Sequence, residues 1–431
     1  MRKFFFLALS IFVSSSHLMV FADTNQEYVS VKPRILISSD IGGTDPDDNQ
    51  SMVHLFMYSD LFELEGLVSS PSFGNGSKEE ILRMIDIYEK DYPILHRNYK
   101  GLMSPKQLRK LCKQGRKGLA PYKGYDLSTE GSEWIVRCAR KQSDRPLYVL
   151  VWGTLEDVAQ ALHDAPDIAG KIRVYWIGGP NKKWGVNSYT YIVENFPDLW
   201  FIENNASYRG LISSKKVDDD YNKNFYDKFI KGAGHIGADF INYYDGLVKM
   251  GDTPSLLYMM NGDPSDPTGD SWGGSFEKIN ESPYTLFERN TTVKDTIAVY
   301  SVVEYQYDGP VLDESCIGNK YFTFRTDRQD WDGVYVGNGK YAVRYSPKQP
   351  DILTYITKSD VKELDGHQGT FVVSATWPGR KTQNSLPLGE NWYSDRQDSA
   401  LFEGKWQGSA TVSRFRVDVL NDWADRLNVL K

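Results

Sequence analysis

One segment indicates the class of fold, and it reads Arg34-Ile35-Leu36-Ile37-Ser38-Ser39-Asp40-Ile41-Gly42-Gly43-Thr44-Asp45-Pro46-Asp47-Asp48-Asn49. Its apolar start predicts a short buried strand, and its second half is a glycine-rich, acidic turn. Residues 50–62 then carry apolar side chains at helical spacing. A strand, a turn and a helix in this order are typical of the first unit of an α/β sheet.

The same alternation continues to about residue 212. Expected strands lie at 64–68, 146–152 and 172–177, and expected helices lie at 79–88, 133–141 and 155–163. The sequence therefore predicts a doubly wound, mostly parallel α/β sheet. In such sheets ligands bind beyond the carboxyl ends of the strands. The turns in which we expect a site are those after Ile37, Val68, Val151 and Ile177.

Two further regions follow the α/β pattern. Residues 281–380 contain short β runs separated by Asp-Gly, Gly-Asn-Gly and proline-rich turns, which predicts an inserted all-β sandwich. In residues 381–431, apolar side chains from Val412 to Leu427 recur every three or four positions, which predicts a helix. We therefore expect the tail to return to an α/β domain formed by residues 23–280.

The first residues predict a secretory signal peptide. Met1-Arg2-Lys3 is basic, residues 4–13 are apolar, and Ala22 supplies a small residue for cleavage. The apolar run is shorter than the about 20 residues that a membrane span needs. We therefore expect residues 1–22 to be removed and the protein to be secreted or periplasmic, without a membrane span.

Composition excludes some classes of function. The net charge of -7 argues against a nucleic acid polymer as a partner. The three cysteines, Cys112, Cys138 and Cys316, allow at most one disulfide, and the six scattered histidines argue against a histidine-based zinc site. The aromatic content of 13% fits either a large core or clefts that bind the faces of sugars.

The acidic turn places four carboxylates within nine residues, and they belong to Asp40, Asp45, Asp47 and Asp48. Their mutual repulsion is unfavourable unless a cation or solvent relieves it. Calcium binds oxygen ligands and tolerates the irregular geometry of a loop. The alternative is that Asp47 or Asp48 caps the following helix on a solvated turn. The position after the first strand of a parallel sheet favours the metal site.

The acidic turn resembles the amino-terminal Asp-x-x-Gly-x-Asp-Asp motif of the nucleoside hydrolases, lengthened by about two residues. Other segments are similar to motifs of that superfamily, and they are Gly74-Asn75, residues 152–159, Gly178-Gly179 and Glu203-Asn204-Asn205. Over residues 24–280 and 385–431 the chain resembles a secreted bacterial branch labelled cellulose-binding. The β insertion resembles the immunoglobulin-like modules of carbohydrate-active enzymes.

This resemblance implies a calcium cofactor and a role for each matching residue. Asp40 is then a calcium ligand and the general base that activates water. Asp47 and Asp48 are further calcium ligands, and the backbone carbonyl of Glu156 also faces the ion. The residues implied to bind sugar hydroxyls are Asn75, Glu203 and Asn205.

The chain departs from the superfamily at two points. A late calcium ligand in a His-Asp pair is missing, and the substitutes are Asp266 and Asp270, just before Trp272-Gly273-Gly274. The leaving-group histidine is also missing from any matching position. Both departures argue against a nucleoside substrate.

Further roles follow from the chemistry of glycosyl transfer to water. Direct attack by water inverts the anomeric centre, and this mechanism expects a second carboxylic acid about 6.5–9.5 Å away. Glu130 is the candidate for this catalytic acid, with a helix cap as its alternative role. Trp152, Trp184 and Trp272 lie in loops or glycine-rich turns, where they either stack on sugar rings or pack internally.

We interpret the sequence as a secreted, calcium-dependent, glycosidase-like hydrolase that cleaves an N- or O-glycosyl bond with activated water. The main alternative is a non-catalytic protein that binds a cellulose-like polysaccharide on the same scaffold. Scarce histidines disfavour a metal-dependent phosphoesterase, and the missing His-Asp pair and the added β region disfavour a nucleoside scavenger. The sugar, its linkage, the anomer and the oligomeric state stay open.

Overall fold

The first strand forms where the sequence predicts it. The computed structural model describes residues 31–212, 224–379 and 381–431, and residues 33–431 belong to one unit. Strand β1 (Arg34–Ser39) is buried at every residue and pairs in parallel with β2 (Glu63–Ser69) and β4 (Leu147–Val151). A strand with parallel neighbours on both sides is covered on both faces, which explains its continuous apolar run. The predicted signal segment, residues 1–22, lies outside the described residues.

The first sheet has the order β3-β2-β1-β4-β5-β6-β18-β7. Its remaining strands are β3 (Cys112–Gln114), β5 (Ile172–Ile177), β6 (Trp200–Asn204), β7 (Phe276–Lys278) and β18 (Trp392–Asp395). All of the pairs are parallel except that between β18 and β7. The predicted class, a mostly parallel α/β sheet, is confirmed.

Helices cover both faces of this sheet. The helices in chain order are α1 (Asp47–Met57), α2 (Lys78–Asn98), α3 (Pro105–Leu111), α4 (Glu130–Ala139), α5 (Glu156–Asp164), α6 (Pro180–Trp184), α7 (Val186–Asn195), α9 (Gly234–Phe240), α10 (Thr253–Met260), α11 (Ala410–Ser413) and α12 (Arg416–Asn428). Ile35 and Ile37 pack in one core with α1, α2 and α12, whereas Leu36 packs in the other core with α4, α5 and α7. The alternation of side chains along a strand therefore separates the two layers.

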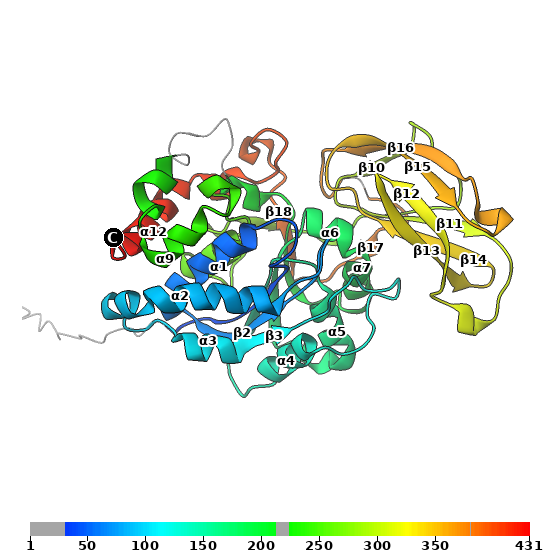
Figure 1. Ribbon diagram of the computed structural model, residues 1–431. Coiled ribbons are helices and arrows are strands. Elements are labelled where there is room, and N and C mark those ends of the chain that lie inside the picture. Colours follow the sequence, from blue (N-terminus) through cyan, green and yellow to red (C-terminus); the bar gives the residue numbers. More distant parts are fainter. Residues whose placement is uncertain (1–30, 213–223, 380) are drawn as a thin grey trace, which may run out of the picture. The chain divides into compact units, whose positions relative to one another are not determined.

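A second sheet forms an all-β region that we call the β-domain. Its strands are β9 (Tyr284–Phe287), β10 (Thr296–Ala298), β11 (Val302–Asp308), β12 (Lys320–Thr326), β13 (Gln329–Gly337), β14 (Lys340–Tyr345), β15 (Asp351–Lys358) and β16 (Gln368–Ser374). They pair in the order β10-β16-β15-β12-β13-β14-β11-β9, mainly antiparallel (Figure 1). Tyr305 of β11 nevertheless contacts Tyr355 of β15, with ring centroids 4.6 Å apart. The sheet thus curls around an aromatic core. The likeness to immunoglobulin modules stays a prediction.

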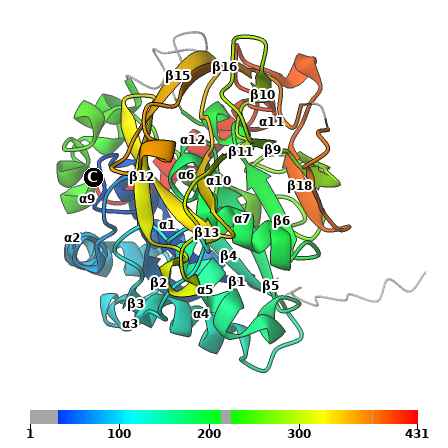
Figure 2. The same cartoon turned by 90° about the vertical axis from the view of Figure 1, so that its right-hand side faces the viewer.

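The β-domain is inserted between two strands of the α/β sheet. The chain leaves after β7 and returns as β18, which pairs in parallel with β6 (Figure 2). Two short strands, β8 (Glu281–Ser282) and β17 (Leu386–Pro387), join the outgoing and returning segments. The helical pattern of the tail did not predict β18, but α12 does form (Figure 1). Its Trp423 packs against Phe225 and Phe240.

The described residues contain no helix that could span a membrane. Within residues 31–212, 224–379 and 381–431, each helix is too short or too polar to cross a bilayer.

Candidate functional site

The acidic turn is held in a tight shape by its glycines. After β1 the amide of Gly43 donates to the carbonyl of Asp40 at 3.0 Å. Gly42 has φ +87, and a Cβ at this position would lie 2.8 Å from the Cβ of Ser77. Only glycine combines this backbone conformation with such a close neighbour. The turn therefore presses against the segment that enters α2, and Asp47 and Asp48 come to lie in the first turn of α1.

Three carboxylates meet at the end of this turn. Asp47, Asp48 and Asp252, which directly precedes α10, each offer an oxygen within 4.8 Å of the others. Oxygens bound to one calcium ion at about 2.3–2.6 Å lie at most about 5 Å apart. Asp48 and Asp252 are almost fully buried, and Oδ2 of Asp252 has no hydrogen-bond partner among the described residues. The donor set and its spacing fit a hard divalent cation.

The electrostatics of the cluster also favour a cation. Burial raises the pKa of Asp40 to about 6, against hydrogen bonding with Ser72 and Asp48. Burial raises the pKa of Asp47 to about 7, and Lys249 opposes this shift. The pKa values of Asp48 and Asp252 lie well above their usual range because of burial and repulsion from the other carboxylates.

Lys249 is the positively charged side chain that pairs with the acidic turn among the described residues. Nζ of Lys249 lies 3.4 Å from Oδ2 of Asp47 and also pairs with Asp45. One ammonium group leaves most of the cluster's charge uncompensated when the carboxyls are ionised. A bound divalent cation would relieve this repulsion.

The cluster opens into a cavity of about 520 Å³, which we call the acidic cavity. It lies beyond the carboxyl ends of the central strands, as parallel sheets predict. Its acidic wall consists of Asp40, Asp45, Asp47, Asp48 and Asp252, and its aromatic residues are Phe73, Trp152, Trp184 and Tyr208. Basic side chains come from Arg209, Lys249 and Lys348.

Several sequence-predicted residues do meet here. Asp40, Asp47, Asp48 and Trp152 line the cavity. The indole Nε1 of Trp152 donates to Oγ of Ser255 at 2.7 Å, which fixes the ring. The turn after β4 is close to the acidic turn, since a Cβ at Gly153 would lie 2.8 Å from Cβ of Asp40. The first and fourth strands thus bring their turns to one site.

The late ligand predicted from the sequence is corrected by the structure. Asp270 is exposed and ion-paired with Arg414, and it does not line the cavity. Asp252 takes the place that the sequence analysis gave to Asp270, and Asp266 binds its own turn through Thr268. The residue before Asp252 is Gly251, and a Cβ there would meet Oδ2 of Asp47 at 2.2 Å, so the chain has no His-Asp pair at this ligand. The Gly251-Asp252 step before a helix was the signal that could have identified this ligand.

The prediction that Glu130 is the catalytic acid is also wrong. This residue lies at the start of α4, outside the acidic cavity, where it pairs with Lys78 at 3.0 Å and Lys113 at 3.3 Å. Burial opposes ionisation, but hydrogen bonds from the Gln114 amide and these lysines lower its pKa to about 2. A carboxyl with this pKa holds no proton at neutral pH and cannot protonate a leaving group.

Glu203 and Asn205, which were predicted to bind sugar hydroxyls, instead make buried contacts within the protein. Glu203 is fully buried, forms an ion pair with Lys182 at 2.7 Å and accepts from Tyr189 at 2.8 Å. Asn205 donates to Glu203 at 2.9 Å and accepts from the Gly179 amide at 2.9 Å. These contacts fix the turn after β5. Neither side chain lines the acidic cavity.

Three other predicted residues also lie outside the cavity lining. Asn75 is exposed, although the adjacent Gly74 approaches the acidic turn. Trp272 is half-buried and packs against the core. The side chain of Glu156 is buried at the start of α5, and burial raises its pKa to about 7.

The basic side of the cavity and its link to the β-domain were not predicted from the sequence. Tyr208 and Arg209 follow β6, Lys249 precedes α10, and no motif marks them. Gln329 and Lys348 come from the β-domain. Only the folded chain brings these five side chains to the acidic turn.

Comparison with known proteins places the chain in a family. The family model described as "Cellulose-binding Sde182, nucleoside hydrolase-like domain" matches residues 34–276. A solved nucleoside hydrolase-related protein from Saccharophagus degradans, described as associated with carbohydrate metabolism, is 18% identical, with a TM-score of 0.50, over 80% of this chain and 100% of its own.

An inosine-uridine preferring nucleoside hydrolase from Bacillus anthracis is 15% identical, with a TM-score of 0.39, over 59% of this chain and 87% of its own. The comparison with curated proteins gives no match. Because the family model covers more than half of the sequence, the chain belongs to the cellulose-binding Sde182 family with a nucleoside hydrolase-like domain.

Proposed function

We propose that the protein is a secreted, calcium-dependent hydrolase that cleaves a glycosyl bond of a carbohydrate with water at the acidic cavity. The observation that carries this proposal is the buried cluster of Asp47, Asp48 and Asp252 beside Asp40. The description of the family as cellulose-binding and of the S. degradans relative as associated with carbohydrate metabolism supports a carbohydrate ligand.

The four carboxylates divide into ion ligands and a general base in this proposal. Asp47, Asp48 and Asp252 hold the ion, and calcium supplies positive charge that favours ionisation of water and binds sugar hydroxyls. Asp40, at the end of the central strand, accepts the proton of the attacking water. The bond from the anomeric carbon to its leaving oxygen or nitrogen breaks as the bond to the water oxygen forms, and the leaving group takes a proton from solvent.

Replacing Asp40 with asparagine tests the catalytic role. We expect kcat to fall by about 10²–10⁴ because the proton acceptor is lost while the shape of the side chain is kept. Hydrolysis of a panel of glycans and nucleosides is measured with and without calcium. Asp270→Asn is the control, since Asp270 is an exposed ion-pair partner. Full turnover in Asp40→Asn would exclude Asp40 as the base.

Calcium removal gives a second test, with a defined pH dependence. The raised pKa values of Asp40, about 6, and Asp47, about 7, mean that the calcium-free fold binds these protons more tightly than the unfolded chain. This stabilisation is complete below about pH 4 and is lost as pH rises through 6 to 7. In a chelator we therefore expect Tm to fall as pH rises from about 4 to about 7.

Calcium stabilises the ionised carboxylates, so the difference in Tm between calcium and chelator should grow over the same pH range. Thermal unfolding followed by circular dichroism measures both curves. Parallel curves in calcium and chelator would contradict a calcium site made of these carboxylates.

One observation favours a second candidate, a protein that binds carbohydrate without cleaving it. Glu130 lies outside the acidic cavity, and Glu203 and Asn205 are occupied within the fold. A leaving group would thus lack the acid that the sequence suggested. Calcium-dependent binding of a glycan without release of any product would establish this second function.

A further inference from the structure

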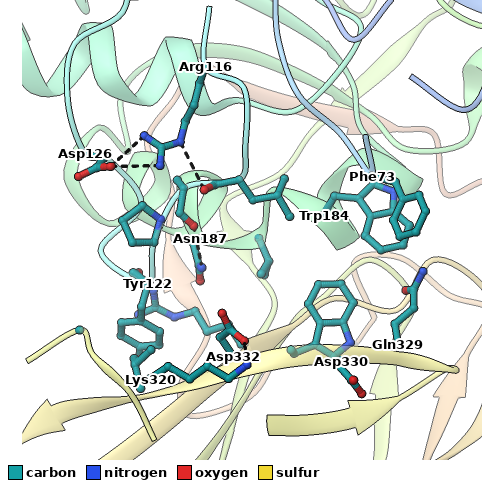
Figure 3. Close-up of a pocket in the computed structure, with 18 residues that line it drawn as sticks. Phe73, Arg116, Tyr122, Asp126, Trp184, Asn187, Lys320, Gln329, Asp330 and Asp332 are labelled. Carbon is teal, nitrogen blue, oxygen red and sulfur yellow. Dashed lines mark hydrogen bonds and ion pairs between the residues drawn. The ribbon is translucent and has the colours of Figure 1, made fainter. Parts of the chain in front are cut away.

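A second cavity adjoins the acidic cavity. It has a volume of about 590 Å³, within the range of ligand-binding clefts. Phe73, Trp184 and Gln329 line both cavities, so the two lie side by side. We call the second cavity the outer cleft. Figure 3 shows Arg116 and Asp126 of the α/β region on one side of it and Asp330 on a strand of the β-domain on the other.

Aromatic rings follow one another along this cleft. Phe73 and Trp184 have centroids 4.8 Å apart, and Trp184 stacks on Trp331 of β13 at 5.7 Å with planes inclined by 18°. Phe73 is 58% exposed, and both tryptophans are half-buried. A large aromatic side chain that stays this exposed at the junction of two cavities offers a surface for the apolar face of a sugar ring.

Polar groups on the walls lack partners. Oδ1 of Asn187, Oε1 of Gln329 and Nε1 of Trp331 are buried without a hydrogen bond among the described residues. Folded proteins rarely leave such groups unpaired. A hydroxyl both donates and accepts, so a polyhydroxylated ligand can pair with either kind of atom after small side-chain rotations. The lining carries three basic and three acidic side chains, so it has no net charge that would select an ionic ligand.

The β-domain is held in place against the cleft by a partly buried ion pair. Nζ of Lys183, in α6, lies 2.5 Å from Oδ2 of Asp327, and the lysine side chain is only 2% exposed. Asp327 and Arg328 have φ values of 49° and 61°, which form the tight turn between β12 and β13. This turn places Gln329 at the acidic cavity and Trp331 beside Trp184. Side chains from the α/β region and from the β-domain therefore form the outer cleft together.

We propose that the outer cleft binds the sugar units that continue from the reacting unit, so that the ligand is an oligosaccharide chain rather than a nucleoside or a single sugar. This inference rests on the proposed function of the acidic cavity and adds a role for the β-domain. The chain runs from the acidic cavity past Phe73 and Trp184 to Trp331. The β-domain thus selects the length of the ligand.

Calorimetry with the full chain in calcium tests this proposal. The probes are gluco-, xylo- and manno-oligosaccharides with β-1,4 linkages and one to six units, titrated into Asp40→Asn to prevent turnover. We expect affinity to rise with length for at least one series. Trp331→Ala in the same background should weaken the hexamer by at least about tenfold and leave the monomer or dimer unchanged.

Two further variants keep the result interpretable. Trp331→Phe retains a ring and should recover part of the affinity, which a general folding defect would not show. Ile352→Ala, at a side chain of the β-domain that is 62% exposed and outside the outer cleft, should bind the hexamer normally. Affinity independent of length, equal hexamer binding in Trp331→Ala, or no binding in any series would overturn the inference.

The failure of this inference can be told apart from failure of the proposed function. If the wild-type enzyme releases sugar in a calcium-dependent reaction with the same kcat/KM for short and long substrates, the function stands and the role of the outer cleft is wrong. If long chains bind through Trp331 but no product forms with or without calcium, the outer cleft stands and hydrolysis is wrong.

Discussion

Asp252→Ala should abolish high-affinity calcium binding, whereas Asp270→Ala should leave it unchanged. Asp252 is one of three carboxylates whose oxygens lie within 4.8 Å, and it is the member contributed from outside the acidic turn. Removing it takes away one ligand and one negative charge, so we expect the Kd for calcium to rise by at least about a hundredfold. Isothermal titration of the chelator-treated protein measures this change.

The pair of variants is well matched because both replace an aspartate in the same part of the chain. Asp270 is exposed and paired with Arg414, so its loss should shift stability by no more than about 1 kcal/mol. Asp252→Ala also relieves repulsion in the calcium-free cluster, so its Tm in chelator should not fall. Normal calcium binding by Asp252→Ala, or its loss in Asp270→Ala, would overturn the assignment of the cluster.

Asp395→Ala should lower the free energy of unfolding by about 3–5 kcal/mol, because it removes the buried acceptor of four hydrogen bonds. Asp395 lies at the end of β18 and is 1% exposed. It accepts from the backbone amides of Asn205, Ala206 and Ser207 and from the Ser207 hydroxyl at 2.6–3.0 Å. Alanine would leave these donors buried and unpaired.

Urea unfolding of the calcium-loaded protein measures this loss. Asp395→Asn should be less harmful than alanine, because its carbonyl oxygen still accepts some of the same bonds. Glu390→Ala is the control, since this side chain is 87% exposed in its ion pair with Lys278 and its loss should matter little. A change below about 1 kcal/mol in Asp395→Ala would show that the bonds add nothing to stability.

The features that could be predicted from the sequence are those whose residues lie close together along the chain. Asp40, Asp47 and Asp48 belong to one turn after one apolar strand, so their proximity follows from local structure. The mostly parallel sheet followed in the same way from alternating patterns. Strand β18 was missed because four residues, Trp392–Asp395, carry no periodic signal of their own. They form a strand because β6 offers them an open edge.

Features that depend on long-range contacts could not be predicted. Asp252 joins the acidic turn only when α10 packs beside α1, and Asp270 seemed equally suitable along the chain. The Glu203-Asn204-Asn205 motif was recognised, but nothing local showed that Glu203 forms an ion pair with Lys182 inside the fold. The prediction that Glu130 is the catalytic acid was wrong for a similar reason, because its partners Lys78 and Lys113 come from other elements. Tertiary packing brings the last ligand to a metal site, and the spacing of residues along the sequence does not show which residue this will be.

The return of the chain to the α/β sheet has a consequence for synthesis. Oγ of Ser394 in β18 donates to the carbonyl of Glu203 in β6 across 191 residues of sequence. While the ribosome makes the intervening β-domain, β6 has an unpaired edge, and such edges invite association with other chains. The inserted domain can form from its own local hairpins in that interval. The α/β sheet is therefore completed after the β-domain, and a chain released before β18 would carry an open edge into a crowded environment.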